Sequence, residues 1–251
     1  MPGAIGPHGP GQPAGPRVRL VPGSVEVAAA AAACRSWDEV VAVSSGCLAC
    51  PELAATRTTV VVGEAPAGAR LALVGEAPGA DEDRAGRPFV GRAGRLLDEL
   101  LAGAGLDRSE VAVLNVLQCR PPGNRAPATP EVARCRGWLD RKLALVGPEL
   151  VVALGLTAAG WFLGRGVRLG AVRGAVHVVD GRRVLPTYHP SAAIRYGPAG
   201  APLAGLRGDL ALAARLLATP DADLPPDADN PGRRPPRTPT RPRTPTTPDA
   251  E

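Results

Sequence analysis

The sequence predicts a layered α/β domain with a mostly parallel sheet, and three observations support this prediction. Short apolar runs recur along the chain, as in strands that are buried on both faces. Segments with apolar residues at helical spacing separate these runs. Sixteen of the 29 prolines lie in residues 1–23 and 219–251, which leaves residues 24–218 as one domain of ordinary size.

Four segments are predicted as strands, and the first three are continuous and apolar. They are residues 70–74, 111–115, 150–154 and 183–187. A hairpin is also expected before the first of them, with a strand over 58–62 and a turn through the sequence GEAP at 63–66. GEAP occurs again at 75–78, where a buried strand ends and a glycine-rich loop begins.

Three helices are predicted from leucine spacing and from capping residues. Leu96, Leu97, Leu100 and Leu101 form an apolar stripe that ends at Gly103. Thr129 is expected to cap a second helix, with Pro130 in its first turn. A last helix carries leucines at 203, 206, 210 and 217.

Charge and hydropathy exclude some classes of protein. The chain has 29 Lys+Arg against 24 Asp+Glu, so a net charge of +5 is compatible both with a nucleic-acid partner and with an ordinary arginine-rich surface. No uncharged apolar run reaches the length of a membrane-spanning helix. The first 20 residues lack the apolar centre of a signal peptide, so a cytoplasmic protein is expected. Both proline-rich ends are expected to be disordered tails.

Polar side chains follow three of the predicted strands. Glu76, Asn115 and His189 each stand just after an apolar run. Taken singly, each has an ordinary explanation as a solvated turn residue, a cap or a structural histidine. Ligands of open α/β sheets bind outside the carboxyl ends of the strands, so the joint position of the three predicts a shared site.

Phe89 is one of only two phenylalanines and lies in the polar loop GRPFVG at 86–91. A phenylalanine in such a loop either anchors the loop to its own domain or offers a flat surface on which a planar ligand stacks. The residue alone does not decide between these interpretations.

Five cysteines in a protein expected in the cytoplasm favour metal or redox chemistry over disulfides. Cys47 and Cys50 form a CxxC pair, and Cys119 and Cys135 follow singly. Together they could hold zinc or an iron–sulfur cluster, and their spacing does not separate the two. The pair could also be a redox pair, and Cys135 could be a small buried residue. Cys34 is expected only to pack.

These segments together resemble the type 4 uracil-DNA glycosylases, the iron–sulfur branch of the uracil-DNA glycosylase superfamily. The similarity covers about residues 40–218 and rests on five separate motifs in the same order. The motifs are GEAPGADEDRAGRPFVGRAG at 75–94, NVLQCRPPGNR at 115–125, EVARC at 131–135, PELVVALG at 148–155 and PTYHPSAAIR at 186–195.

The resemblance implies a three-layer α/β/α sandwich on a four-stranded parallel sheet. It implies a [4Fe–4S] cluster held by Cys47, Cys50, Cys119 and Cys135, although the longer segment before Cys47 leaves Cys34 as a competing ligand. It further implies removal of uracil from single- or double-stranded DNA, leaving an abasic site for base excision repair. We expect a bacterial monomer that acts on nucleoid DNA and binds no membrane.

The resemblance also implies a role for each site residue. Glu76 would orient water and stabilise the cationic sugar, Asn115 would read the edge of uracil, and His189 would donate to its O2 atom. Phe89 would stack on the base, while backbone N–H groups around Ala77 and Gly79 would approach it. Ser191 would hold a DNA phosphate, and Arg195, Arg120 and Arg125 would contact further phosphates.

Two other functions are kept as alternatives. A module that binds uracil-containing DNA without turnover would keep the same pocket. An iron–sulfur electron-transfer protein would use the cysteines but would leave Asn115, Phe89 and His189 without a role. A related branch is trapped covalently on DNA by a histidine in an inserted basic loop, and no such insertion follows Cys119, so ordinary turnover is expected.

Overall fold

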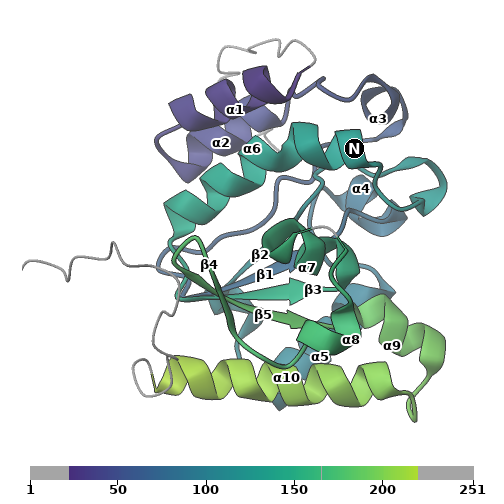
Figure 1. The fold of residues 1–251 in the computed structure, drawn as a ribbon. Coiled ribbons are helices and arrows are strands. Elements are labelled where there is room, and N and C mark those ends of the chain that lie inside the picture. The colour runs from purple at the N-terminus through teal and green to yellow at the C-terminus, as the bar shows by residue number, and fades with distance from the viewer. Residues whose placement is uncertain (1–22, 165, 220–251) are drawn as a thin grey trace, which may run out of the picture. The chain divides into compact units, whose positions relative to one another are not determined.

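A computed structural model describes residues 23–164 and 166–219, so nearly all of both predicted tails lies outside the described residues. At its centre is one sheet with the strand order β2-β1-β3-β5-β4 (Figure 1). The strands are β1 (Leu71–Gly75), β2 (Val111–Asn115), β3 (Leu150–Leu154), β4 (His177–Val179) and β5 (Arg182–Thr187). Every residue of β1, β2 and β3 is buried, as their continuous apolar sequences predict.

The first four strands in this order are parallel, which confirms the predicted parallel core of the sheet. The expected count of four strands is one too low, because β4 pairs with β5 in antiparallel register. Asp180 and Gly181 join the two strands, and both have positive φ angles of 49° and 74°. An Asp-Gly pair is a sequence feature of tight hairpins, so this strand could have been predicted.

The hairpin predicted over residues 58–74 is wrong. β1 has β2 on one side and β3 on the other, so neither of its edges is free for a further strand. The 58–64 segment instead follows the outer edge of β2, where the backbone groups of Glu64 and Val113 exchange hydrogen bonds of 3.0 and 2.7 Å. The Val61 N–H donates to the Gln118 carbonyl at 2.8 Å.

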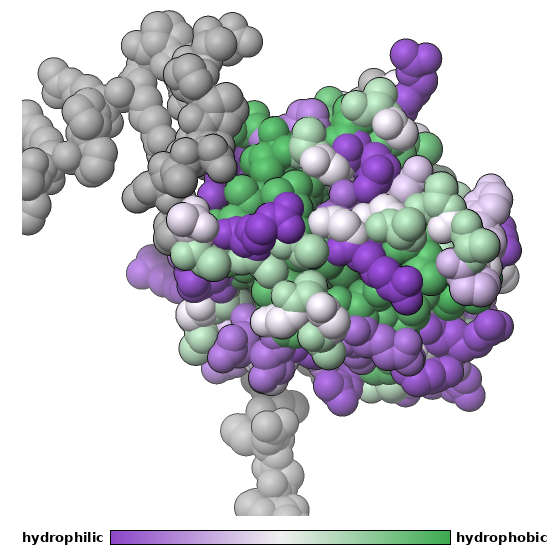
Figure 2. Space-filling model, turned by 90° about the horizontal axis from the view of Figure 1, so that it is seen from below, coloured by the Kyte–Doolittle hydropathy of each residue, from purple (hydrophilic) through white to green (hydrophobic). Residues whose placement is uncertain are grey.

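Helices cover both faces of the sheet. One face packs against α5 (Arg92–Gly103), α9 (Pro190–Tyr196) and α10 (Ala201–Ala218), which lie below the sheet in Figure 1. The other packs against α6 (Thr129–Val146) and α7 (Leu156–Leu163). These are the three layers implied by the family resemblance. The outer surface seen from below mixes hydrophilic and hydrophobic side chains (Figure 2).

The predicted cap of α6 is one residue too late. Ala128 is the N-cap residue and Thr129 is the first residue of the helix. The cap is made by Glu131, whose carboxylate accepts a hydrogen bond of 2.7 Å from the Ala128 N–H. Pro130 lies in the first turn as predicted, where its missing N–H costs no helical hydrogen bond.

A further group of helices lies outside α6. It contains α1 (Ser24–Ala33), α2 (Trp37–Ser44) and α3 (Pro51–Thr56), and α1 packs along α6 (Figure 1). The remaining helices are short and belong to loops: α4 (Ala80–Ala85), η1 (Arg108–Glu110), η2 (Pro122–Asn124) and α8 (Leu169–Val172). Among the described residues, none of these helices combines the length and apolarity that crossing a membrane requires.

Gly137 allows α1 and α6 to approach closely, since a Cβ atom at this position would lie 2.7 Å from the Ala28 Cα atom. We predict that Gly137→Val lowers the free energy of unfolding by about 1–3 kcal/mol, because overpacking forces the two backbones apart. Urea denaturation of the full chain measures this change. Gly103→Ala is the control, because the space around Gly103 is open, and it should be neutral or slightly stabilising. Equal stability of the Gly137→Val variant and the parent would contradict the close contact.

Candidate active site

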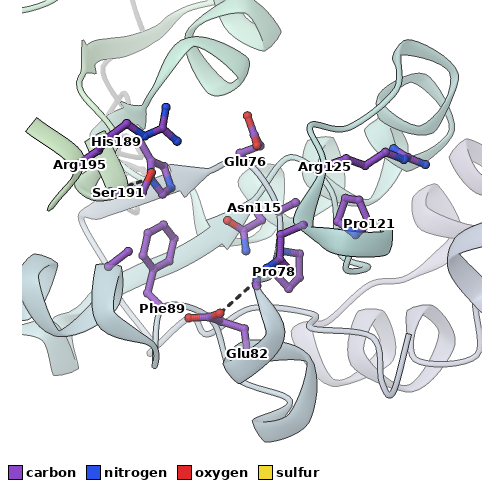
Figure 3. Close-up of a pocket in the computed structure, with 14 residues that line it drawn as sticks. Glu76, Pro78, Glu82, Phe89, Asn115, Pro121, Arg125, His189, Ser191 and Arg195 are labelled. Atoms are coloured by element: carbon purple, nitrogen blue, oxygen red, sulfur yellow. Dashed lines mark hydrogen bonds between the residues drawn. The ribbon is translucent and has the colours of Figure 1, made fainter. Parts of the chain in front are cut away.

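A cavity of about 350 Å³ lies where the carboxyl ends of β1, β2 and β5 meet. All eight residues predicted as catalytic or substrate-binding line it: Glu76, Ala77, Gly79, Phe89, Asn115, His189, Ser191 and Arg195. Figure 3 labels six of them (Glu76, Phe89, Asn115, His189, Ser191 and Arg195) and shows that they come from several elements around one space. The parallel register explains this convergence, because it sets Gly75 beside Asn115 and Leu154 beside Thr187. Their roles in catalysis remain predictions.

Gly75 is the last residue of β1 and directly precedes Glu76, which lines the cavity. A Cβ atom here would come within 2.5 Å of both the Asn115 Oδ1 atom and the Phe89 ring. The absence of a side chain at Gly75 therefore lets the amide and the ring lie next to each other. The loop that carries Glu76 begins at the next residue.

Asn115 ends β2 with its side chain turned into the cavity (Figure 3). The residue is 4% exposed, and its Oδ1 atom has no hydrogen-bond partner among the described residues. A buried polar atom without a partner is costly, so such an atom in a cavity indicates a place for a ligand that supplies the missing hydrogen bond. An amide offers one acceptor and one donor group side by side, which suits the edge of a nucleobase.

Glu76 is half-buried, and its carboxylate is held from the far side of the sheet. The hydroxyl of Thr157, in the first turn of α7, donates a hydrogen bond to Glu76 Oε2. The Glu76 backbone carbonyl accepts a further hydrogen bond of 3.0 Å from the Leu117 N–H. The sequence alone did not single out Thr157, because a threonine in a helical turn usually only caps it.

Phe89 forms one wall of the cavity and is held in a strained conformation. Its φ angle is +53°, a region that residues other than glycine rarely adopt. Its ring lies 5.7 Å from the imidazole of His189, at an angle of 33° between the two planes. Arg108 donates to the Pro88 carbonyl at 2.9 Å, and a Cβ on Gly94 would collide with the Phe89 carbonyl. The ring therefore has a fixed position in the cavity.

Glu82 ties two loops of the site together and was missed by sequence reasoning. Its Oε1 atom accepts hydrogen bonds from the Val90 and Gly91 N–H groups at 3.0 and 2.8 Å, next to Phe89. Its Oε2 atom accepts one of 3.1 Å from the Gly79 N–H. The Gly79 N–H, expected to approach the ligand, is thus directed to Glu82. A Glu three residues after an N-cap is the capping-box spacing, which could have identified it.

His189 is neutral at physiological pH, with a defined tautomer. Its Nδ1 atom accepts a hydrogen bond of 3.2 Å from the Ser191 N–H, and the Ser191 hydroxyl lies 2.8 Å from the same atom. These contacts leave the proton on Nε2, as assigned from the hydrogen bonds. Burial lowers the pKa of His189 to about 4, against the opposing charge of Glu82. The ring is therefore a neutral hydrogen-bond donor.

The arginines expected at DNA phosphates differ in their surroundings. Arg195 lies on α9, is exposed and lines the cavity. Arg125 also lines it, but its guanidinium forms two hydrogen bonds of 3.0 and 2.7 Å with Glu131 and points away from Asn115 (Figure 3). Arg120 donates to Asn124 Oδ1 at 2.7 Å. Of the three, Arg195 is best placed to meet a phosphate at the cavity.

The four cysteines predicted as ligands lie in one apolar cluster beneath α1, α2, α3 and α6, together with Cys34. Burial raises the pKa of Cys119 to about 12 and that of Cys135 to about 11. No group of three or more histidine, cysteine or acidic side chains is arranged for one metal ion in the part of the chain that the structure describes.

Donor groups around these sulfur atoms suit an anionic group. Arg57 donates to Cys119 Sγ at 3.3 Å, and Gln118 to Cys135 Sγ at 3.8 Å. A hydrogen bond from Arg134 lowers the pKa of Cys50 against the larger effect of burial. The thiol of Cys34, by contrast, donates to the Ala30 carbonyl at 3.3 Å. The donor set thus fits a cluster held by the four other thiolates.

Comparison with known proteins agrees with this geometry. The family model of the uracil DNA glycosylase superfamily matches residues 62–205. The chain is 47% identical over 151 residues to a type-4 uracil-DNA glycosylase of Thermotoga maritima, an alignment that covers 59% of this chain and 78% of the relative. It is 42% identical over 171 residues to the type-4 uracil-DNA glycosylase of Archaeoglobus fulgidus, covering 65% of this chain and 85% of the relative. It is 41% identical over 159 residues to the type-4 uracil-DNA glycosylase of Pyrobaculum aerophilum, covering 59% of this chain and 80% of the relative.

Together with the α/β/α layers and the cavity at the strand ends, these matches define the class: the chain has the fold of the uracil DNA glycosylase superfamily. Within that superfamily it belongs to the type-4 uracil-DNA glycosylase family. The resemblance noted in the sequence motifs is thereby confirmed.

Glu82 provides a test of the site that depends on positioning alone. We predict that Glu82→Gln lowers kcat for uracil excision by about 100-fold, because an amide presents only one oxygen and one loop then shifts away from its productive position. Steady-state excision from a uracil-containing oligonucleotide measures this change. Glu99→Gln, on the exposed side of α5, is the matched control and should leave kcat unchanged. A Glu82→Gln variant with the parent's kcat would show that the carboxylate does not position the loops.

Proposed function

We propose that this protein hydrolyses the N-glycosidic bond of uracil in single- or double-stranded DNA and leaves an abasic site for base excision repair. The observation that carries the proposal is the cavity itself. It brings a carboxylate, an amide with an unpartnered buried oxygen, a fixed aromatic ring and a neutral imidazole donor to one rim. This set matches the chemical needs of a base removed from the stack and cleaved from its sugar.

Recognition of the base is assigned to Asn115 and Phe89. Uracil carries an N3–H donor and an O4 acceptor on the same edge, and the Asn115 amide complements both. The unpartnered Oδ1 atom of Asn115 would accept the N3–H hydrogen bond. Phe89 would stack against the base, in the position that its backbone conformation fixes. Both contacts require the nucleotide to leave the stack, and Arg195 would hold the displaced phosphate.

Bond cleavage is assigned to Glu76 and His189. The oxygen of a water molecule bonds to C1′ of the sugar, and the electron pair of the C1′–N1 bond leaves with the uracil. The proton that the water loses passes to solvent, from which the uracil anion is protonated. Glu76 orients the water and stabilises the positive charge that develops on the sugar. His189 donates a hydrogen bond from its Nε2–H to the uracil O2 atom as negative charge builds there, and it keeps the proton. Ser191 keeps this proton on Nε2 through its contacts with Nδ1.

The reaction needs no covalent intermediate with the protein. The chain contains one lysine, Lys142, which is fully buried in α6 and does not line the cavity. No lysine amine is therefore offered to the sugar for a Schiff base, and strand cleavage by the enzyme is not expected. This supports a monofunctional glycosylase. The same residues argue against a pure electron-transfer protein, in which Asn115, Phe89 and His189 would have no role.

The cofactor assigned to the protein is a [4Fe–4S] cluster on Cys47, Cys50, Cys119 and Cys135. The apolar surroundings and the donors directed at the sulfur atoms support this assignment. When bound, it supplies a rigid cross-link between segments that are distant in sequence. We further assign the enzyme to residues 24–218 of a cytoplasmic monomer, and residues 219–251 to a tail outside it.

Two substitutions test the assigned roles directly. We predict that Glu76→Gln lowers the single-turnover excision rate by about 100-fold or more, because the amide cannot stabilise the cationic sugar. Asn115→Ala should lower it by about 100-fold, because the uracil edge then has no partner. Glu110→Gln, an exposed change outside the cavity, is the control. A cluster-loaded parent protein that leaves uracil DNA intact would overturn the proposed function, and a normal rate in either variant would remove that residue from the site.

The pH dependence tests the state of His189. A pKa of about 4 means that the ring is neutral from about pH 5.5 to 8, so kcat should show no titration near the ordinary histidine value of about 6.5. Below pH 4 the ring gains a proton on Nδ1 and loses the acceptor that Ser191 uses. Because the folded-state pKa lies below the unfolded one, this histidine also destabilises the fold as pH falls from about 6.5 to 4. An inflection in kcat near pH 6.5 that is absent in His189→Asn would contradict the assignment.

A further inference from the structure

Lys142 is the only lysine in the chain and one of its most deeply buried residues. It lies on the inner face of α6, two turns after Cys135, and its exposed fraction is 0%. Its ammonium group donates to two buried oxygen atoms, the Val62 carbonyl and Gln118 Oε1. Neither of these is charged, and the proposed mechanism gives this group no role.

A buried cation without a negative partner is costly, so its retention needs a reason. Within the described ranges, no carboxylate lies within ion-pair distance of Lys142. Burial lowers the pKa of Lys142 to about 7, and Cys135 and Cys119, when ionised, are the groups whose charge opposes this effect. Lys142 thus lies next to side chains assigned to the cluster, and an anion held by Cys135 and Cys119 would supply the charge partner that its two neutral acceptors lack.

Gln118 connects the two groups. It is 2% exposed, and its Oε1 atom accepts from Lys142 while its Nε2 atom donates to Cys135 Sγ at 3.8 Å. An amide between a cation and a sulfur atom is polarised by the cation, which strengthens the hydrogen bond that it gives to the sulfur. Gln118 also directly precedes Cys119. The two hydrogen bonds therefore form a continuous chain from the ammonium group to the sulfur atom of Cys135.

We propose that Lys142 is the buried counter-charge of the iron–sulfur cluster, and that Gln118 passes its effect to Cys135. This inference rests on the cluster assigned in the proposed function. Four thiolates outweigh the positive charge of the cluster core, so the bound group is an anion, and a reduced cluster is more so. A nearby cation stabilises the bound cluster and favours its reduced form, because net charge and hydrogen bonds to sulfur set the reduction potential.

The experiment uses cluster-loaded protein with Lys142→Met, which keeps the volume of the side chain and removes its charge. We expect the cluster to be lost to an iron chelator about 10- to 100-fold faster than from the parent. We also expect a lower midpoint potential, measured by spectroelectrochemistry. The matched control is Arg141→Met, on the neighbouring residue of α6, whose guanidinium bonds the Cys34 carbonyl and not a proposed ligand. It should change neither quantity.

Two further variants keep the test decisive. Gln118→Leu keeps Lys142 but removes the amide that connects it to Cys135. It should speed cluster loss to the chelator and lower the midpoint potential, each by less than Lys142→Met does. The exchanged pair Gln118→Lys with Lys142→Gln keeps one cation and one amide in contact, so it should restore most of the chelator resistance lost in Lys142→Met. Parent-like release and potential in both Lys142→Met and Gln118→Leu would overturn the inference while leaving the cluster in place. A parent protein that takes up no iron and sulfide would overturn the cluster itself.

Discussion

The parallel register of β1, β2, β3 and β5 is the constraint on which the rest of the structure depends. It brings the ends of separate strands to one edge, where β1, β2 and β5 lead to Glu76, Asn115 and His189. Gly75 then decides how closely these residues approach, because its missing side chain is the space in which Asn115 and Phe89 meet. The strand ends thus set where the cavity lies, and the loops and helices that follow them supply most of its lining.

The sequence was informative where a single residue type had one structural meaning. Continuous apolar runs identified the parallel strands, and polar residues after them identified Glu76, Asn115 and His189. Phe89 stood out because an aromatic side chain is rare in a polar loop. The family resemblance then supplied the roles of these residues, which their types alone left open.

The features that sequence reasoning missed depend on contacts between segments far apart in the chain. Glu82 looks like an ordinary surface acid of a short helix, yet it holds the backbone beside Phe89. Thr157 reaches Glu76 across 81 residues of sequence. The false hairpin failed for the same reason, since local turn chemistry could not reveal that both edges of β1 are taken by other strands. Periodicity predicts which face of an element is buried but not which partner covers it.

The chain's single lysine has a consequence for its surface chemistry. Since Lys142 is fully buried, every cationic side chain that the folded surface offers to a phosphate belongs to arginine. Guanidinium groups keep their charge at any pH that the protein meets, and acylating reagents that modify lysine amines do not neutralise them. Amine-directed labels and cross-linkers should therefore reach the chain terminus alone. The attraction of this protein to a polyanion can be tuned by salt, but not by lysine acetylation.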